Sequence, residues 1–282
     1  MKNLRLILIL VIISIIPVTQ VIAGDWKKIK IATEGAYPPW NSMDKSGNLV
    51  GFDIDLAKDL CQRMKLECEI IPQKWRAIIK GLNQGKYDAI MAAVSITEPR
   101  KELVSFSRAY ADAPNIFVVR KDHPLANFRS TLKHLSLNDV SPAEQALLDS
   151  IINEFRGKKI GVQVQTIFQR FADRYLGDYS DIRIYDFQYT IDLDLWQGRL
   201  DALIGDMAYY VPFIQTEQGK DYKIIEPYMT GGPFGEGIGV AVRHKDQDLV
   251  EMFSSAIGEA LADGTVKELA IKWFGFDVSA HE

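Results

Sequence analysis

Hydrophobic and polar positions follow two periods along this chain, and together they predict an α/β protein. Residues 28–33 alternate as a strand with one buried face does, and residues 87–94 are almost entirely apolar, like a strand buried on both faces. Apolar side chains spaced three and four residues apart over 54–64 predict an amphipathic helix, with Asp53 as its N-cap.

The remaining elements follow the same two periods. Residues 141–152 begin with Ser141, Pro142 and Glu144, the signature of a helix start. Residues 230–237 are rich in glycine and are expected to be flexible. Further strands are expected at 67–71, 116–119, 158–163, 181–185, 222–225 and 238–242, and further helices at 75–82, 166–175, 190–197, 248–262 and 266–274.

One segment of the chain has a similar counterpart later in the sequence, and we call this internal similarity the echo. Residues 84–93 read QGKYDAIMAA and residues 197–206 read QGRLDALIGD, and both predict a helix closed by glycine and followed by a buried strand. A chance likeness of a common helix-to-strand motif is the alternative. With the other elements, the echo predicts two similar lobes: lobe 1 from 24–114 and 239–282, and lobe 2 from 115–238.

The echo places Ala93 and Asp206 at matching carboxyl ends of strands, where open α/β sheets bind ligands. Arg100 can pair with an α-carboxylate through two hydrogen bonds, and Asp206 can accept hydrogen bonds from an α-ammonium group. Ser95, the N–H of Ala93 and the residues near Thr166 can complete the bonding of the carboxylate. Taken singly, Arg100 also fits a solvated charge and Asp206 a helix cap.

An acid and two aromatic residues predict the pocket for the ligand's side chain. Glu34 follows the strand at 28–33, and Tyr37 and Trp75 supply rings. An acid beside aromatic rings suits a cationic group, because the carboxylate neutralises the charge while the rings pack on the stem. Both rings also fit ordinary core positions.

The first 23 residues are expected to be a cleaved secretory signal. Lys2 and Arg5 precede an apolar run over 6–16, and residues 21–23 fit a cleavage site before Gly24. A membrane anchor is the alternative, but the run is short for a span of about 20 residues.

Two cysteines, Cys61 and Cys68, are expected to form a disulfide in an exported protein, with two buried thiols as the alternative. With no histidine nearby they do not predict a zinc site.

Composition narrows the possible partners. The chain has 282 residues, 47% of them hydrophobic, which is enough for two domains. It has 33 basic and 37 acidic residues, and two of the basic ones lie in the signal segment, so the remainder has a net charge near −6. This charge argues against nucleic acid as a partner.

The motifs also stand in the order of a known family. They are GFDIDLA (51–57), DAIM (88–91), SITEPR (95–100), GRLDA (198–202), and DGT (263–265) with WF (273–274). Over residues 26–278 the chain resembles the periplasmic solute-binding proteins, family 3, of polar amino-acid ABC transporters. Within them it is most similar to the lysine/arginine/ornithine-, histidine- and opine-binding group.

The resemblance implies a fold and a site. The fold is the two-lobed periplasmic-binding-protein fold (type II), an α/β fold with two hinge-crossing strands and a ligand cleft between the lobes. It implies a Cys61–Cys68 disulfide. The residues that match ligand-binding positions are Arg100 and Ser95 for the carboxylate, Asp206 for the ammonium, and Glu34, Tyr37 and Trp75 for the side chain.

The chain departs from the pattern in three places. Ala92 and Ala93 replace serines often found in the basic-amino-acid binders. Residues 164–168 replace the usual Gly-Ser/Thr-Thr pattern, so Thr166 keeps one hydroxyl and Ile167 offers only its N–H. Residues 121–157 are longer than in the simplest members and resemble the opine-binding branch. Asp206, by contrast, suits a primary ammonium better than the substituted amine of an opine.

The expected function is therefore a periplasmic receptor that delivers a cationic L-amino acid to the membrane subunits of an ABC permease. Arginine is favoured, followed by lysine, ornithine and histidine. We expect no cofactor and no metal, and we expect the protein to be a monomer. An opine-binding receptor is the alternative, and a sensor or chemoreceptor partner is equally compatible. An enzyme such as a periplasmic dehydratase needs an acid–base group in the cleft, for which Glu34 is the candidate.

Overall fold

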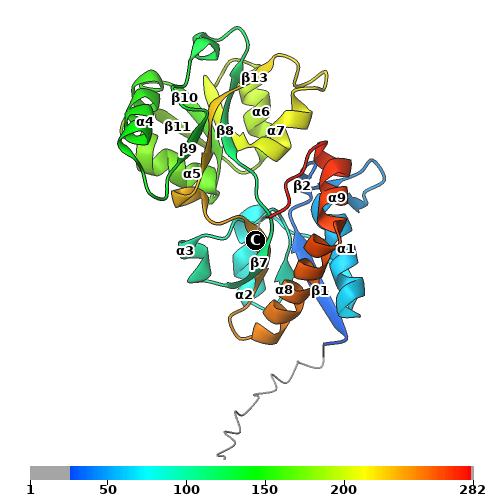
Figure 1. Ribbon diagram of the computed structural model, residues 1–282. Coiled ribbons are helices and arrows are strands. Elements are labelled where there is room, and N and C mark those ends of the chain that lie inside the picture. The colour runs from blue at the N-terminus through cyan, green and yellow to red at the C-terminus, as the bar shows by residue number, and fades with distance from the viewer. Residues whose placement is uncertain (1–25, 281–282) are drawn as a thin grey trace, which may run out of the picture.

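The computed structural model describes residues 26–280 as two lobes, each built on one main sheet (Figure 1). The expected signal segment 1–23 lies outside the described residues. Within them, no helix combines the length and the apolar character needed to span a membrane.

The sheet of lobe 1 has five strands in the order β5-β1-β6-β14-β7. Its first three strands are parallel, and β14 runs antiparallel to both β6 and β7. The strands are β1 (Lys28–Thr33), β5 (Glu67–Pro72), β6 (Ala89–Ile90), β7 (Ser105–Ala111) and β14 (Ile238–Val242).

The sheet of lobe 2 has six strands in the order β11-β10-β12-β8-β13-β9. β10 is parallel to β11 and β12, whereas β8 is antiparallel to β12 and β13. The strands are β8 (Asn115–Arg120), β9 (His134–Ser136), β10 (Lys159–Gln163), β11 (Asp181–Tyr185), β12 (Ala202–Asp206) and β13 (Tyr222–Thr230).

Helices and a small sheet complete the lobes. In lobe 1, α1, α8 and α9 pack on one another beside the sheet (Figure 1). The other elements of lobe 1 are the small sheet β2 (Ala36–Tyr37), β3 (Asn41–Met43) and β4 (Leu49–Val50), with α1 (Phe52–Met64), η1 (Trp75–Ala77), α2 (Ile78–Asn83), α3 (Glu98–Lys101), α8 (Gln247–Ala262) and α9 (Thr265–Phe274). Lobe 2 and its link to lobe 1 contain η2 (Pro124–Asn127), α4 (Pro142–Glu154), α5 (Ile167–Phe171), η3 (Ala172–Leu176), α6 (Gln188–Trp196), α7 (Met207–Phe213) and η4 (Gly232–Phe234).

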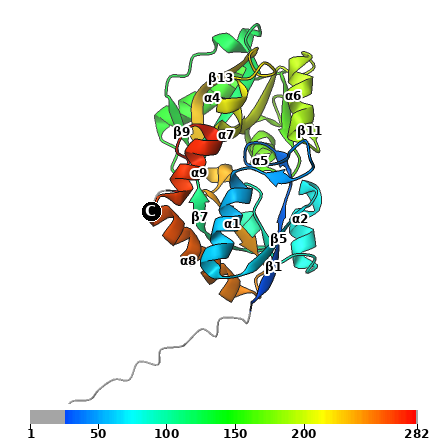
Figure 2. The same cartoon turned by 90° about the vertical axis from the view of Figure 1, so that its right-hand side faces the viewer.

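The chain passes between the lobes over two short segments. It leaves the first sheet at Ala111 and enters the second at Asn115, then returns between Thr230 and Ile238. In Figure 2, β7 and the C-terminal end lie at one side of the molecule, while α2 and β11 lie at the opposite side. We call the side of β7 the linked side of the two lobes, and the opposite side, with α2 and β11, the unlinked side.

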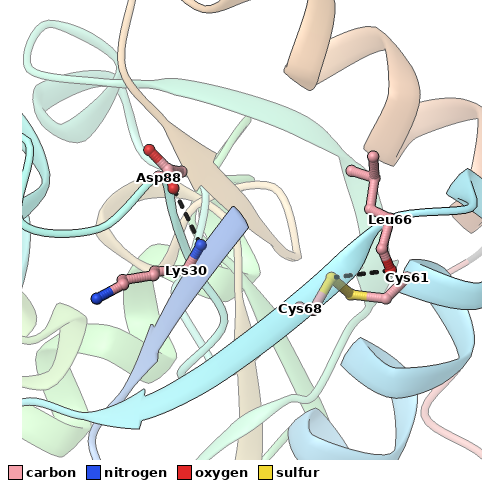
Figure 3. Close-up of a disulfide and its surroundings, with 5 residues drawn as sticks. All are labelled: Lys30, Cys61, Leu66, Cys68 and Asp88. Carbon is pink, nitrogen blue, oxygen red and sulfur yellow. Dashed lines mark hydrogen bonds between the residues drawn. A yellow bond between two sulfur atoms is a disulfide. The ribbon is translucent and has the colours of Figure 1, made fainter. Parts of the chain in front are cut away.

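A disulfide and a shared core stabilise this arrangement. Cys61 of α1 and Cys68 of β5 form the expected disulfide (Figure 3). One cluster of buried apolar side chains runs from lobe 1 into lobe 2, where Tyr37 of β2 stacks on Tyr209 of α7 with ring centroids 4.9 Å apart. The lobes are thus held in contact by packing as well as by the crossings.

The two similar segments of the echo form structurally equivalent strands, one in each lobe. Ala89 of β6 pairs with Ile31 of β1, and Ala202 of β12 pairs with Ile160 of β10, so each copy lies beside the first parallel strand of its sheet. The strand expected over 87–94 is shorter than predicted, because the chain turns out of the ladder and Ala93 adopts a φ of 49°.

Two expectations about helix starts have different outcomes. The capping box of Ser141 and Glu144 is present. Asp53, however, is not an N-cap: Gly51 occupies that position, and Asp53 lies in the first turn of α1.

Substitution of Gly235 tests the returning crossing. Gly235 has a φ of 87°, and a Cβ there would lie 2.1 Å from the main-chain oxygen of Ile96. We expect Gly235→Ala to lower the free energy of unfolding by more than about 2 kcal/mol, because left-handed strain of about 1–2 kcal/mol is joined by a backbone clash. Urea unfolding measures the change.

Gly264→Ala is the matched control. Gly264 has a φ of 86°, and a Cβ there would meet no heavy atom of the described residues within 4 Å beyond its chain neighbours, so it carries the same strain without the clash. Equal losses for the two variants would show that the contact with Ile96 does not constrain the crossing.

Candidate functional site

A cavity of about 250 Å³ lies between the lobes, and every ligand-binding residue predicted from the sequence lines it. Three strand ends converge there: Glu34 follows β1, Ala93 follows β6, and Asp206 ends β12. The sheets thus bring together positions that are up to 172 residues apart in the chain. The predicted residues on its wall are Glu34, Tyr37, Trp75, Ala93, Ser95, Arg100, Thr166, Ile167 and Asp206.

Arg100 is a buried cation that pairs with no acidic side chain in the part of the chain that the structure describes. It is 4% exposed, and it forms no ion pair within residues 26–280. Its Nη1 donates to the main-chain oxygen of Ser95 at 2.9 Å and its Nη2 to that of Gln165 at 3.2 Å, while its Cζ lies 5.3 Å from the centroid of the Trp75 ring. Burial, and secondarily the charge of Arg170, lowers the pKa of Arg100 to about 10, so the guanidinium remains charged at neutral pH.

Glu34 forms a hydrogen bond across the cleft. Its Oε1 accepts from Nε2 of Gln163, the last residue of β10, at 3.0 Å, and the same nitrogen donates to the main-chain oxygen of Asp186 at 3.1 Å. Burial raises the pKa of Glu34 to about 7, and the hydrogen bond from Gln163 opposes that shift. A cation placed beside Glu34 would favour its charged form.

Asp206 is held by donors from both lobes. Its Oδ2 accepts from the hydroxyl of Tyr37, and its Oδ1 accepts from Nε1 of Trp40 at 3.3 Å and from the N–H of Tyr209 at 2.8 Å. It caps α7, as the alternative interpretation allowed, and it also lines the cavity. Burial raises the pKa of Asp206 above the ordinary value of an aspartate.

The structure corrects the role expected for Ala93. Its N–H, expected to bond the ligand's carboxylate, instead donates to Oδ2 of Asp53 at 2.9 Å. Asp53 is fixed in turn by Nδ2 of Asn41 at 2.9 Å and the hydroxyl of Tyr110 at 2.7 Å. Ala93 therefore forms part of the cavity wall without offering its N–H, and its hydrogen bond to Asp53 fixes the backbone there.

Thr166 is likewise engaged within its own loop. Its hydroxyl donates to the main-chain oxygen of Gln163 at 2.7 Å and accepts from the N–H of Gln169 at 3.3 Å, so Thr166 is the N-cap of α5. The hydroxyl proton is therefore already used in a hydrogen bond within the loop. The donors from this loop that we still expect to contact a ligand are the main-chain N–H groups of Thr166 and Ile167.

The cavity also includes residues that the sequence did not single out. Gln163 ends β10 as Glu34 follows β1, so the strand-end rule applied to Glu34 predicts it too. Asn138 belongs to the segment 121–157, and its Oδ1 accepts from the N–H of Gly232 at 2.8 Å. No sequence pattern marked Asn138. The other missed polar residues are Asp112, Asn115, Thr230 and Glu236.

Acidic side chains outnumber basic ones on the wall. Among the described residues, Glu34, Asp112, Asp206 and Glu236 line the cavity, and Arg100 is their basic counterpart. An anion is therefore favoured only near Arg100, and a cation elsewhere. Within residues 26–280, no histidine lines the cavity and no cluster of three or more His, Cys, Asp or Glu side chains could hold a metal ion.

Comparisons with known proteins agree with this geometry. The chain is 36% identical over 277 residues to an octopine-binding periplasmic protein of Rhizobium meliloti, covering 92% of this chain and 94% of the relative. It is 33% identical over 255 residues to an L-arginine-binding protein of Pseudomonas aeruginosa, covering 89% and 90%. An ancestral arginine-binding protein bound to arginine superposes with a TM-score of 0.72 at 30% identity, covering 88% of this chain and 98% of that one.

These similarities confirm the predicted two-lobed type II fold. They also support a binding protein rather than an enzyme, because the named relatives are binding proteins. The family model for bacterial extracellular solute-binding proteins, family 3, matches residues 29–276. The chain therefore belongs to the bacterial extracellular solute-binding proteins, family 3.

Proposed function

We propose that this protein is the periplasmic receptor of an ABC importer and that it binds a cationic L-amino acid, with arginine favoured over lysine, ornithine and histidine. The observation that carries the proposal is the buried guanidinium of Arg100, which pairs with no acid among the described residues, on a wall whose other charged side chains there are acidic. An amino acid with a cationic side chain has one anionic group and two cationic groups, which matches this distribution of charge.

We propose one orientation for the ligand on this wall. The α-carboxylate lies at Arg100 and Ser95, opposite the main-chain N–H groups of Thr166 and Ile167, since a charged guanidinium binds a carboxylate through two strong hydrogen bonds. The α-ammonium lies at Asp206. The side chain extends between Tyr37 and Trp75 and places its cation at Glu34 and Gln163.

Hydrogen bonds between the lobes connect this orientation to hinge closure. We propose that the lobes, 24–114 with 239–282 and 115–238, close on the ligand and that the closed form docks on the permease. Trp75 Nε1 donates to the main-chain oxygen of Val164 at 2.9 Å, and Arg76 Nη2 lies 2.7 Å from Oδ1 of Asp186 on the unlinked side. A ligand that contacts Arg100 of lobe 1 and Asp206 of lobe 2 would bridge the same two lobes and so favour the closed form.

An opine is the second candidate ligand. It is favoured by the octopine-binding relative and by Asn138, which the segment 121–157 adds to the wall. We rank it below an amino acid because a second carboxylate at the nitrogen would lie close to Asp206, where like charges repel.

Calorimetry with two variants tests the assignment of Glu34 and Arg100. We expect wild-type protein to bind arginine more tightly than lysine, ornithine, histidine or octopine. Arg100→Ala should abolish detectable binding of every α-amino acid. Glu34→Gln should weaken arginine about 100-fold and a neutral ligand such as glutamine less than threefold, because a buried charged hydrogen bond contributes about 1.5–3 kcal/mol.

Two outcomes would contradict these assignments. No heat with any of the five ligands would refute a receptor for cationic amino acids. Equal losses for arginine and glutamine in Glu34→Gln would refute the placement of the side-chain cation beside Glu34.

Proton release on binding gives an independent test of Glu34. Its pKa of about 7 in the free protein means that about half of the molecules carry the proton at pH 7, and a nearby cation lowers this pKa. Arginine binding near pH 6.5 should therefore release a proton, and arginine affinity should rise between about pH 5 and pH 7. Calorimetry in buffers of different ionisation enthalpy counts the protons released.

The α-ammonium can also displace a proton from Asp206, whose pKa is raised as well. Glutamine is the control ligand for the protons released from Asp206, since it presents the same ammonium without a side-chain cation. The extra release with arginine over glutamine should disappear in Glu34→Gln; if it persists, another group takes the part assigned to Glu34.

A further inference from the structure

Asn115, the first residue of β8, carries a hydrogen-bond acceptor that nothing in the described structure satisfies. The side chain is 3% exposed and lines the cavity. Its Nδ2 donates to the main-chain oxygen of Met229 at 3.1 Å, which fixes the orientation of the amide. Its Oδ1 is buried and has no hydrogen-bond partner among residues 26–280.

This acceptor lies beside the proposed ammonium site. Asn115 is paired in register with Asp206, on the antiparallel neighbour β12. Residues paired in this way project from the same face of the sheet with their Cβ atoms about 5 Å apart. Both side chains line the same cavity, so an amide oxygen and a carboxylate form one acceptor-rich corner.

Asp206 alone cannot satisfy an ammonium group. A carboxylate has about four acceptor positions, and a primary ammonium has three N–H donors. The hydroxyl of Tyr37, Nε1 of Trp40 and the N–H of Tyr209 already donate to Asp206, which leaves room for at most one more donor. The ligand needs another acceptor close by, and a buried amide oxygen without a partner is a feature that calls for an explanation.

We propose that Oδ1 of Asn115 is a second acceptor for the ligand's α-ammonium and makes this corner selective for a primary amine. The inference rests on the proposed function and extends it to a residue outside the predicted set. The secondary amine of an opine brings one N–H fewer and adds a carboxylate to a corner that offers only acceptors. A primary ammonium satisfies both Asp206 and Asn115.

Two variants isolate the acceptor. Asn115→Leu has a similar shape and no polar atom, whereas Asn115→Asp retains an oxygen acceptor. Both lose the hydrogen bond from Nδ2 to Met229, so the comparison between them separates the acceptor from that structural contact. Thermal unfolding of each ligand-free variant reports the effect on the fold itself.

A matched pair of ligands isolates the ammonium. Arginine and 5-guanidinopentanoic acid differ only in the α-amino group. By calorimetry, Asn115→Leu should weaken arginine about tenfold or more and the analogue less than twofold. Asn115→Asp should weaken arginine no more than about threefold.

The results that would overturn the proposal are distinct from those that would overturn the proposed function. If wild-type protein binds arginine and Asn115→Leu binds it equally well, Asn115 is not an acceptor and the receptor function stands. Equal losses for arginine and the analogue show that Asn115 acts only through the fold. If wild-type protein binds no α-amino acid, the proposed function fails and this inference fails with it.

Discussion

The burial of Arg100, with no acidic partner among residues 26–280, is the constraint on which the site depends. A desolvated cation is costly, and main-chain oxygens of Ser95 and Gln165 offset only part of that cost because they carry partial charges. Arg100 reaches Ser95 within lobe 1 and Gln165 in lobe 2, so its guanidinium spans the cleft. An anion bound there would complete its bonding and would contact both lobes at once. On the proposed function, affinity and lobe closure would therefore both depend on Arg100.

Two acids of the wall, Asp206 and Glu34, have neutral hydrogen-bond partners and do not neutralise Arg100. Asp206 is taken up by Tyr37 and Trp40, and Glu34 by Gln163, all neutral donors. Neutral partners hold a carboxylate in place while leaving its charge uncompensated, which keeps it attractive to a cation. Burial raises the pKa of both acids, and the hydrogen bonds from these neutral partners oppose that rise only in part.

The sequence predicted those features of the fold and the site that follow from hydrophobic periodicity and from the position of strand ends. The echo located Asp206 opposite the segment that holds Arg100, and the rule that ligands bind at carboxyl ends of strands located Glu34. It could not predict which hydrogen bonds are already used inside the protein. The N–H of Ala93 and the hydroxyl of Thr166 have the right position but are committed to Asp53 and Gln163, and these commitments depend on tertiary packing. Asn138 was out of reach because its loop has no periodic pattern.

If the protein binds an amino acid as proposed, the same hydrogen-bond inventory indicates how charged and neutral wall residues would share the selectivity. Asp206 has little acceptor capacity left, so in the proposed complex it would attract an ammonium through its charge more than through a set of hydrogen bonds. Hydrogen-bond selectivity then falls to neighbours that are neutral and incompletely bonded. A neutral acceptor adds little long-range attraction but penalises a ligand that fails to donate to it, because a buried group without a partner costs more than a satisfied one gains. On the proposed function, charge on the wall would select the class of ligand, and incompletely bonded neutral groups would select among members of that class.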